Sequence, residues 1–200
     1  ESDVPYTDQE LNDAERLYRS TDPVQFVLSR SIIEEPGSSW YYNSGLPVLL
    51  GLIVSRATGQ PFGVYASKTL FEPLGIQQVK WHVFGDDAWR GVPELAWDGT
   101  ESWNRVASPE GGLWLRPRDA LKIGSVYLND GRWNGQQVIP AHWVEASTRR
   151  HIPTADSISE FGEHGYGYLW WHDRFRTEEG PLQVHTAAGN GGQRIYIIPE

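Results

Sequence analysis

The segment Pro36-Gly37-Ser38-Ser39-Trp40-Tyr41-Tyr42-Asn43-Ser44 leads directly into the longest apolar run of the chain, Leu46 to Val54. Pro36-Gly37 interrupts regular structure before the aromatic cluster, because both residues are strong breakers. Ser44 is predicted to cap the N-terminus of a helix from Leu46 to Ala57. That helix is apolar on every side, so we expect it to be buried in a core.

The composition is that of a folded, acidic chain without cysteine. Hydrophobic residues make up 39% of the 200 residues and ten are tryptophan, which excludes disorder and predicts a real core. The net charge of −9 argues against nucleic acid and anionic membranes as partners. The absence of cysteine excludes disulfides and thiolate metal sites. The longest apolar run is too short for the ~20 residues of a membrane-spanning helix.

Both ends of the chain are interpreted as cuts. The sequence contains no methionine, opens at Glu1 without a signal peptide, and ends its last predicted strand at Pro199-Glu200. We therefore expect one partial domain over residues 1–200, truncated at both ends.

Helices are predicted first along the chain and antiparallel strands last, which is typical of the α+β class. Caps, prolines and apolar spacing predict further helices from Thr7 to about Arg19, Asp22-Pro23 to Ser29, Pro61 to Leu70, Pro117 to Leu128 and Ala141 to Ser147. Alternation predicts strands at 79–83, Tyr166–Phe175, Leu182–Ala187 and Gln193–Ile198. Gly59 is predicted to end the helix that begins near Leu46. Turns are predicted at Asp130-Gly131, Asn134-Gly135 and Glu179-Gly180. Residues 85–110, rich in Gly, Trp, Asp and Pro, are predicted to form a long loop.

Several kinds of catalytic motif are absent from the 200 residues. The six histidines form neither HxH nor HExxH, and no phosphate loop or GxSxG elbow occurs, so we expect no metal and no cofactor. A Ser-x-x-Lys pair is also missing. The residues three positions before the lysines are not serines: Tyr65 precedes Lys68, Gln77 precedes Lys80, and Asp119 precedes Lys122.

Four segments, in order, resemble the penicillin-recognising serine hydrolases, and within them the class C β-lactamase-like branch. The first is the opening segment with Leu49-Leu50-Gly51 and Ala57-Thr58-Gly59. The others are Phe71-Glu72-Pro73-Leu74-Gly75, then 111–135 with Gly111-Gly112-Leu113-Trp114, and finally Tyr166–Trp171 with Ala188–Gln193. The resemblance implies a β-lactamase/transpeptidase-like fold, with a helical region followed by antiparallel strands.

The resemblance also implies roles for particular residues. Tyr42 falls on the catalytic tyrosine, and Ser44 falls where many members have Asn. The stretch Gly189, Asn190, Gly191 and Gly192 resembles the K-T-G or H-x-G strand edge that lines the substrate, with Asn190 or Gly189 near the basic position. Trp171 is a further candidate for substrate contact. In the family, the nucleophilic Ser and its Lys lie upstream of this region.

The expected chemistry is acyl transfer. Tyr has an ordinary pKa near ~10, and a nearby lysine ammonium would lower it enough for Tyr42 to take the proton from the serine. Glycine backbone N–H groups at the strand edge would bind the acyl oxygen. Ser44 in place of Asn favours ester or linear amide substrates over lactams. Without its nucleophile the chain alone is expected to be inactive, with the missing N-terminal segment as its partner.

Simpler interpretations stand beside these. Tyr42 can be a core aromatic, Ser44 only a helix cap, and Gly189–Gly192 an ordinary hairpin turn. Trp170 and Trp171 would place one ring on each face of a strand, and His172 and His185 are interpreted as structural. The alternative function is a non-catalytic module that binds glycan or peptide through the tryptophan-rich loop, with Trp89, Trp97 and Trp103.

Overall fold

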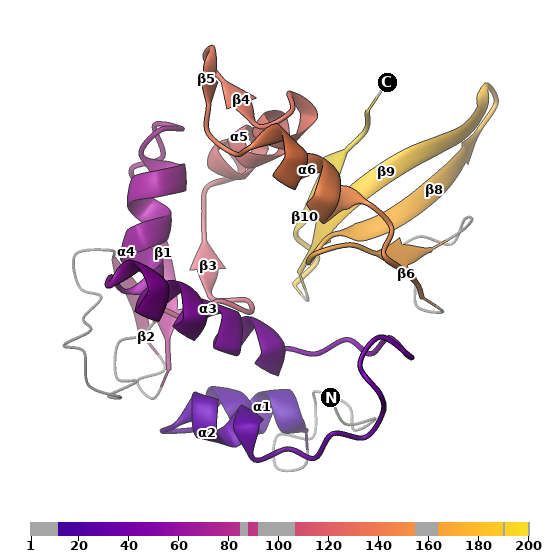
Figure 1. Ribbon diagram of the computed structural model, residues 1–200. Coiled ribbons are helices and arrows are strands. Elements are labelled where there is room, and N and C mark those ends of the chain that lie inside the picture. The colour runs from indigo at the N-terminus through magenta and orange to yellow at the C-terminus, as the bar shows by residue number, and fades with distance from the viewer. Residues whose placement is uncertain (1–11, 85–87, 92–106, 155–163, 190, 200) are drawn as a thin grey trace. The chain divides into compact units, whose positions relative to one another are not determined.

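The structure, a computed structural model, describes residues 12–84, 88–91, 107–154, 164–189 and 191–199 (Figure 1). Its contacts divide the chain into two compact units, residues 1–115 (unit 1) and residues 116–200 (unit 2). Helices and antiparallel strands occur together, which confirms the predicted α+β class. Within the described ranges, every helix is too short or too polar to span a bilayer.

Unit 1 begins with three helices: α1 (Asp13–Tyr18), α2 (Pro23–Leu28) and α3 (Gly45–Thr58). The Asn12 side chain caps α1 by accepting from the backbone N–H groups of residues 14 and 15, at 3.0 and 3.2 Å. The predicted capping box at Thr7 lies outside the described residues. Asp22 caps α2 as predicted, because its carboxylate accepts from the N–H of residue 25 at 2.9 Å.

The burial of α3 differs from the prediction. Its buried side, with Val48, Gly51 and Ser55, faces the unit, and Val48 joins Leu17 and Phe84 in a core cluster. The opposite side leaves three large aliphatic residues at least half exposed, namely Leu46 (56%), Leu50 (50%) and Ile53 (59%). The expectation that the whole helix is buried was therefore wrong. The helix ends as predicted at Gly59, whose φ of +67° is in the left-handed region.

The second half of unit 1 links a helix to a small sheet. Helix α4 (Phe62–Ala66) continues into one π-helical turn, η1 (Ser67–Phe71), in which the N–H of Glu72 bonds the carbonyl of Ser67 at 2.8 Å. Phe71 is buried beside Trp81, with ring centres 6.3 Å apart. The antiparallel sheet has the order β2-β1-β3, with β1 at Lys80–Val83, β2 at Ala88–Gly91 and β3 at Leu113–Trp114. Strand β2 lies where only a loop was predicted.

Unit 2 opens with helices and a hairpin close to their predicted positions. Helix α5 spans Pro117–Leu128, and α6 spans Ala141–Thr148. The hairpin between them pairs β4 (Arg132–Trp133) with β5 (Gln136–Gln137). Its turn residues Asn134 and Gly135 have φ values of +47° and +81°, as a tight hairpin turn requires.

A five-stranded antiparallel sheet forms the rest of unit 2, in the order β10-β9-β8-β7-β6. Its strands are β6 (Ile152–Pro153), β7 (Gly165–Tyr166), β8 (Trp171–Thr177), β9 (Gly180–Ala188) and β10 (Arg194–Ile197). The single strand predicted at Tyr166–Phe175 is therefore two strands. They are separated by a turn in which Leu169 adopts φ +65°.

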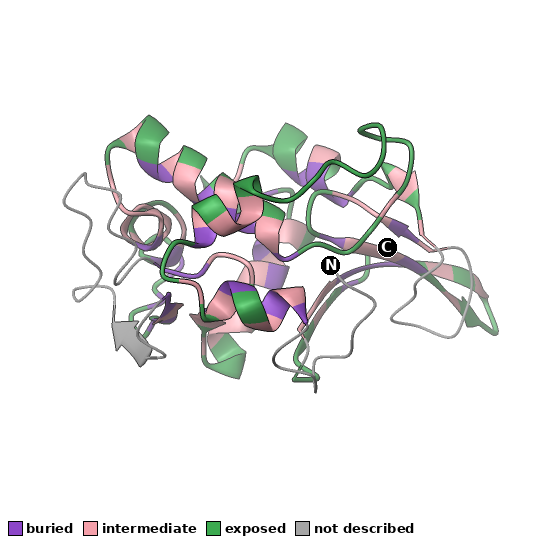
Figure 2. Ribbon diagram, turned by 90° about the horizontal axis from the view of Figure 1, so that it is seen from below, coloured by how far each residue is buried: buried purple, intermediate pink, exposed green. Residues whose placement is uncertain are grey.

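The helices of unit 2 pack on this sheet. Helix α5 contacts β10, where a Cβ atom added at Gly124 would lie 2.9 Å from the Ile195 side chain. Tyr127 of α5 packs on the buried Trp170, with ring centres 4.6 Å apart. In unit 1, buried residues lie on the helices and on β1, whereas every residue from 28 to 39 is exposed; Figure 2 colours buried residues purple and exposed residues green.

Candidate active site

The two adjacent tyrosines of unit 1 have different surroundings. The Tyr41 hydroxyl donates a hydrogen bond to the Glu34 carboxylate at 2.7 Å. Hydrogen bonds from Ser39, then Tyr41 and Ser38, lower the pKa of Glu34. Tyr42 instead packs edge-on against Trp40, with ring centres 6.4 Å apart, and is 39% exposed. Tyr42 is thus an accessible aromatic residue at the start of α3 and not a core aromatic.

Ser44 is the residue directly before α3, but the side chain that caps the helix is that of Asn43. The Asn43 carbonyl oxygen accepts from the backbone N–H groups of Gly45 at 2.8 Å and Leu46 at 3.0 Å. Ser44 has φ −76° and ψ −20°, already helical, and its side chain makes no capping hydrogen bond. Ser44 thus holds the predicted position at the start of the helix, but its side chain does not cap it, because a capping residue usually has a non-helical backbone and that of Ser44 is already helical.

Ser44 is nevertheless held tightly next to Tyr42. It is 8% exposed, and the glycine that follows it lets α3 approach α2 closely. A Cβ atom at Gly45 would lie 2.9 Å from the Val27 side chain. Ser44 is therefore a buried residue at the point where α3 packs against α2.

The glycine-rich segment of unit 2 forms the turn between β9 and β10. The N–H of Gly189 donates to the carbonyl of Gln193, and the N–H of Gly192 donates to the carbonyl of Gly189, both at 3.0 Å. Gly192 has φ +86°, where glycine is favoured. Gly191 belongs to the same turn, and Asn190 lies outside the described residues. The interpretation as a hairpin turn is confirmed, and it is compatible with a role in substrate binding.

Sequence reasoning missed Gln193, which lies over this turn. A Cβ atom at Gly189 would lie 2.1 Å from the Gln193 amide nitrogen, and one at Gly191 would lie 2.8 Å from its oxygen. The Arg194 guanidinium donates to the carbonyl of Gly189 at 2.8 Å. The only signal in the sequence was the position of a long amide side chain directly after Gly191-Gly192.

Strand β9 leaves one edge unpaired next to this turn. Its pairing with β8 ends at the Trp171–Thr186 pair, whereas its pairing with β10 continues through Ala187 and Ala188. On the β8 side, Ala187 and Ala188 thus have no partner among the described strands. An exposed strand edge offers backbone N–H and C=O groups to an extended ligand.

Trp171 stands at the end of that pairing. Its ring packs edge-on against Tyr166, with centres 5.0 Å apart, and it is only partly buried. Trp170 is 7% exposed and belongs to the core. Trp170 precedes β8, which begins at Trp171, so the structure does not place both tryptophans on one strand as predicted. Contact of Trp171 with substrate stays a prediction. Trp97 and Trp103 lie outside the described residues, as does the side chain of Trp89.

Two buried polar residues of β9 were also missed as site candidates. His185 is 6% exposed and Thr186 is fully buried, and neither the His185 Nδ1 atom nor the Thr186 hydroxyl has a hydrogen-bond partner among the described residues. His185 lies opposite His172 on β8, with ring centres 5.3 Å apart. Burial, and then His172, lowers the pKa of His185 to about 4, so it is neutral at pH 7.

His172 and Asp173 complete this polar part of the sheet. Burial, and then the charges of Arg150 and Arg174, lowers the pKa of His172. Asp173 is 1% exposed and lies 3.1 Å from the His164 Nδ1 atom. The described residues contain no group of three or more His, Cys, Asp or Glu side chains that could hold a metal ion.

Unit 1 holds a buried acid that sequence reasoning also missed. The Ser108 hydroxyl, 1% exposed, donates to the Glu110 carboxyl, whose second oxygen is buried without a partner among the described residues. Burial raises the pKa of Glu110. Gly112 packs closely against Ser108, since a Cβ atom added at Gly112 would lie 2.6 Å from the carbonyl oxygen of Ser108.

Comparison with known proteins establishes the family. The sequence model of the family described as Beta-lactamase matches residues 2–200, nearly the whole chain. This chain belongs to the beta-lactamase family. The fold is accordingly the β-lactamase/transpeptidase-like fold, and the serine β-lactamase and penicillin-binding-protein-like resemblance of the sequence is confirmed.

The relatives of the chain are longer than the chain itself. It is 25% identical to an uncharacterized protein of Alkalihalophilus pseudofirmus over 82% of this chain and 50% of that protein. A proposed 6-aminohexanoate-dimer hydrolase from Bacillus anthracis has a similar structure, with TM-score 0.65, 21% identity, and coverage of 88% of this chain and 40% of the other. A D-stereospecific amidohydrolase from Streptomyces has TM-score 0.62 and 17% identity, with coverage of 98% and 60%. The chain thus spans about half the length of the curated relative it matches.

Proposed function

We propose that this chain carries the proton-transfer and substrate-edge parts of a serine hydrolase that cleaves ester or linear amide bonds through an acyl-enzyme. The observation that supports the proposal best is the position of Tyr42. Its ring is 39% exposed just before α3, and it stands between the Pro36-Gly37 and Leu49-Leu50-Gly51 motifs at the position that the family resemblance gives to the catalytic tyrosine. The family consists of serine hydrolases, and the solved structures with a similar fold include an amidohydrolase.

In the proposed mechanism, Tyr42 takes the proton from a serine hydroxyl and passes it to the leaving group. General acid–base transfer of this kind contributes about 10²- to 10⁴-fold to a rate. In unit 2, the unpaired edge at Ala187 and Ala188 and the Gly189–Gly192 turn bind the acyl part of the substrate through backbone groups. Gly189, Asn190, Gly191, Gly192 and Trp171 keep their predicted roles as substrate contacts.

We assign His185 as a second candidate for the basic position of the strand edge, beside Asn190 or Gly189. It precedes the unpaired edge by two residues, and Thr186 follows it. At neutral pH His185 acts as a hydrogen-bonding imidazole, because its charged form is disfavoured by burial. Ser44 adds a small hydroxyl beside Tyr42, which supports esters and linear amides over lactams.

The nucleophilic serine and its lysine are proposed to come from sequence outside these 200 residues, since no Ser-x-x-Lys occurs within them. The 200-residue chain should then fail to react with a fluorophosphonate probe or a chromogenic ester. The same chain expressed with the sequence that flanks it in its gene should be labelled on one serine.

The matched variants are Tyr42→Phe and Tyr41→Phe in that longer protein. Tyr42→Phe should lower kcat by about 10²- to 10⁴-fold with little change in KM, whereas Tyr41→Phe should keep most of the activity. Equal losses in the two variants would contradict the assignment of Tyr42. Serine labelling of the 200-residue chain alone would contradict the external nucleophile.

A further inference from the structure

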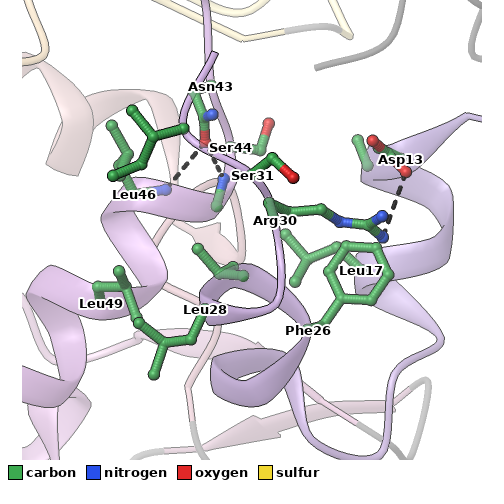
Figure 3. Close-up of a pocket in the computed structure, with 14 residues that line it drawn as sticks. Asp13, Leu17, Phe26, Leu28, Arg30, Ser31, Asn43, Ser44, Leu46 and Leu49 are labelled. Atoms are coloured by element: carbon green, nitrogen blue, oxygen red, sulfur yellow. Dashed lines mark hydrogen bonds and ion pairs between the residues drawn. The ribbon is translucent and has the colours of Figure 1, made fainter. Parts of the chain in front are cut away.

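A cavity of about 390 Å³ lies in unit 1, between α1, α2, residues 30–32 and the start of α3 (Figure 3). Its volume is within the range of about 300–1,000 Å³ that small-molecule sites occupy. Figure 3 shows Leu46 and Leu49 of α3 on one side of the cavity and Leu17 and Phe26 on the other. Two residues of the tyrosine motif, Asn43 and Ser44, also line this cavity.

The cavity is apolar and carries no net charge. Its walls are mostly aliphatic side chains and one aromatic ring, among them Leu17, Phe26, Leu28, Leu46 and Leu49. The two charged residues that line it neutralise each other, since the Arg30 guanidinium lies 3.4 Å from the Asp13 carboxylate. Arg30 also lies over the Phe26 ring, 4.0 Å from its centre. A neutral, apolar group matches such walls, whereas an ion would be bound without a counter-charge.

Polar groups converge at the end of the cavity that borders the tyrosine motif. Ser44 is 8% exposed and is part of both the cavity and the Tyr42-Asn43-Ser44 sequence. The Asn43 carbonyl oxygen is occupied by the backbone of α3, so the ligand is offered the Asn43 amide N–H₂ group as a donor. An apolar cavity with a few converging polar groups is the usual form of a binding site for an uncharged organic ligand.

We propose that this cavity binds the aliphatic chain of a neutral ester or amide, with a polar group of that ligand next to Asn43 and Ser44. The substrate role of that ligand rests on the proposed function, but binding itself does not. The cavity thereby selects substrates with a linear apolar chain, and chain length determines affinity.

A different occupant, a polypeptide helix lying along α3, defines the contrasting outcome. The exposed side of α3 continues past the cavity through Leu50 and Ile53, and a packed helix would contact this whole side. Leu46 and Leu50 are the same residue type on the same helix, 56% and 50% exposed, but only Leu46 lines the cavity. Substitution of each in turn therefore separates the two occupants.

The test is an NMR shift titration of the 200-residue chain with butanamide, hexanamide and octanamide, followed at the Gly45 and Leu46 amides. Affinity should rise about fourfold for each added methylene group, or about 15-fold for each step of the series. Leu46→Ser should weaken octanamide binding about three- to tenfold, and Leu50→Ser should leave it unchanged. Circular dichroism establishes that both variants are folded.

The proposal is overturned by an affinity that does not depend on chain length, or by equal losses in Leu46→Ser and Leu50→Ser. Ser31→Trp, which places a large ring at the cavity wall, should also abolish binding, and unchanged binding there would contradict the location. Tyr41→Phe, at a residue that does not line the cavity, should bind octanamide as the unmodified chain does. Failure of the acyl-chain site and failure of the Tyr42 chemistry are thereby distinguished, because the titration needs no turnover.

Discussion

Units 1 and 2 differ in the polar side chains that they enclose. Unit 1 leaves a row of aliphatic residues exposed on α3 and partly buries one acid, Glu110, beside the buried Ser108. Unit 2 covers its sheet with α5 but buries His185, Thr186 and Asp173 within it. Unit 1 thus places aliphatic side chains at the surface of one helix, whereas unit 2 encloses polar side chains of which some atoms have no hydrogen-bond partner among the described residues.

The largest expected effects come from glycines that touch backbone. A side chain at Gly112 in unit 1 would meet the carbonyl of Ser108 at 2.6 Å, and one at Gly131 in unit 2, where φ is +82°, would meet the carbonyl of Ile139. Gly112→Ala and Gly131→Ala should each cost about 3 kcal/mol of stability. Residue-resolved amide exchange should show weakened protection chiefly in the unit that carries the substitution.

Gly59→Ala is the matched control for these variants. Gly59 has φ +67° but no atom within 4 Å of an added Cβ, so only the backbone conformation is strained, at about 1 kcal/mol. Equal losses at Gly59 and Gly112 would show that close contact with Ser108 is unimportant. Protection lost equally throughout both units would mean that they unfold as one.

The next largest effect is the response of unit 2 to acid. The folded pKa of His185, about 4, lies below its ordinary 6.5, so between these pH values the unfolded chain binds a proton that the folded chain does not. The contribution of His185 to the free energy of unfolding is therefore fully present above pH 6.5. It falls by about 3 kcal/mol as the pH is lowered to 4. His185→Gln should remove most of this dependence in urea unfolding followed at the β9 amides. A slope unchanged by His185→Gln would refute the burial argument.

A smaller effect tests the corrected cap of α3. Asn43→Ala removes the acceptor of two helix N–H groups and should destabilise unit 1 by about 1 kcal/mol. Ser44→Ala keeps the cap and should change the stability much less. Thermal unfolding of the two variants compares them directly, and a larger loss in Ser44→Ala would restore Ser44 as the cap.

The smallest expected effect is the pH dependence caused by Glu110, which lowers stability as the pH rises, whereas His185 lowers it as the pH falls. The pKa of Glu110 is raised, so the folded chain holds its proton more tightly than the unfolded chain and loses stability as the pH rises through the raised value. Glu110→Gln keeps an oxygen for the Ser108 hydroxyl and removes the charge, and it should stabilise unit 1 at pH 8 by up to about 1 kcal/mol. Amide exchange at β1 measures it. A loss of stability at pH 8 would contradict the buried-acid interpretation.

Local signals in the sequence predicted where many helices and strands lie, but not which other elements pack against them. Asp22, Gly59 and the helix at Pro117–Leu128 were predictable, because caps and prolines act within one or two turns. The exposed side of α3 was not, since an all-apolar helix gives no indication of which face is covered. Adjacent cap-competent residues at 43 and 44 were indistinguishable until the backbone angles were known.

Site residues in a distinctive motif could be predicted from the sequence. Site residues that are distinguished only by their burial could not. The aromatic cluster around Tyr42 could be recognised from its flanking glycine and leucine motifs. His185 and Thr186 could not, because a strand that alternates polar and apolar residues predicts solvent on one face, and both residues are buried. The split of Tyr166–Phe175 depends on the left-handed backbone of Leu169, a residue type that rarely adopts it.

The π-helical turn at Ser67–Phe71 has a consequence for how the length of this chain can vary. Such a turn is an α-helix with one residue too many, and here the N–H group of Glu72 reaches back five residues to the carbonyl of Ser67, at 2.8 Å. Deletion of one residue from the turn would restore ordinary four-residue spacing without shortening the path to β1. This segment is therefore a place where an ancestor of the chain could gain a residue, or a descendant lose one, without a change of fold.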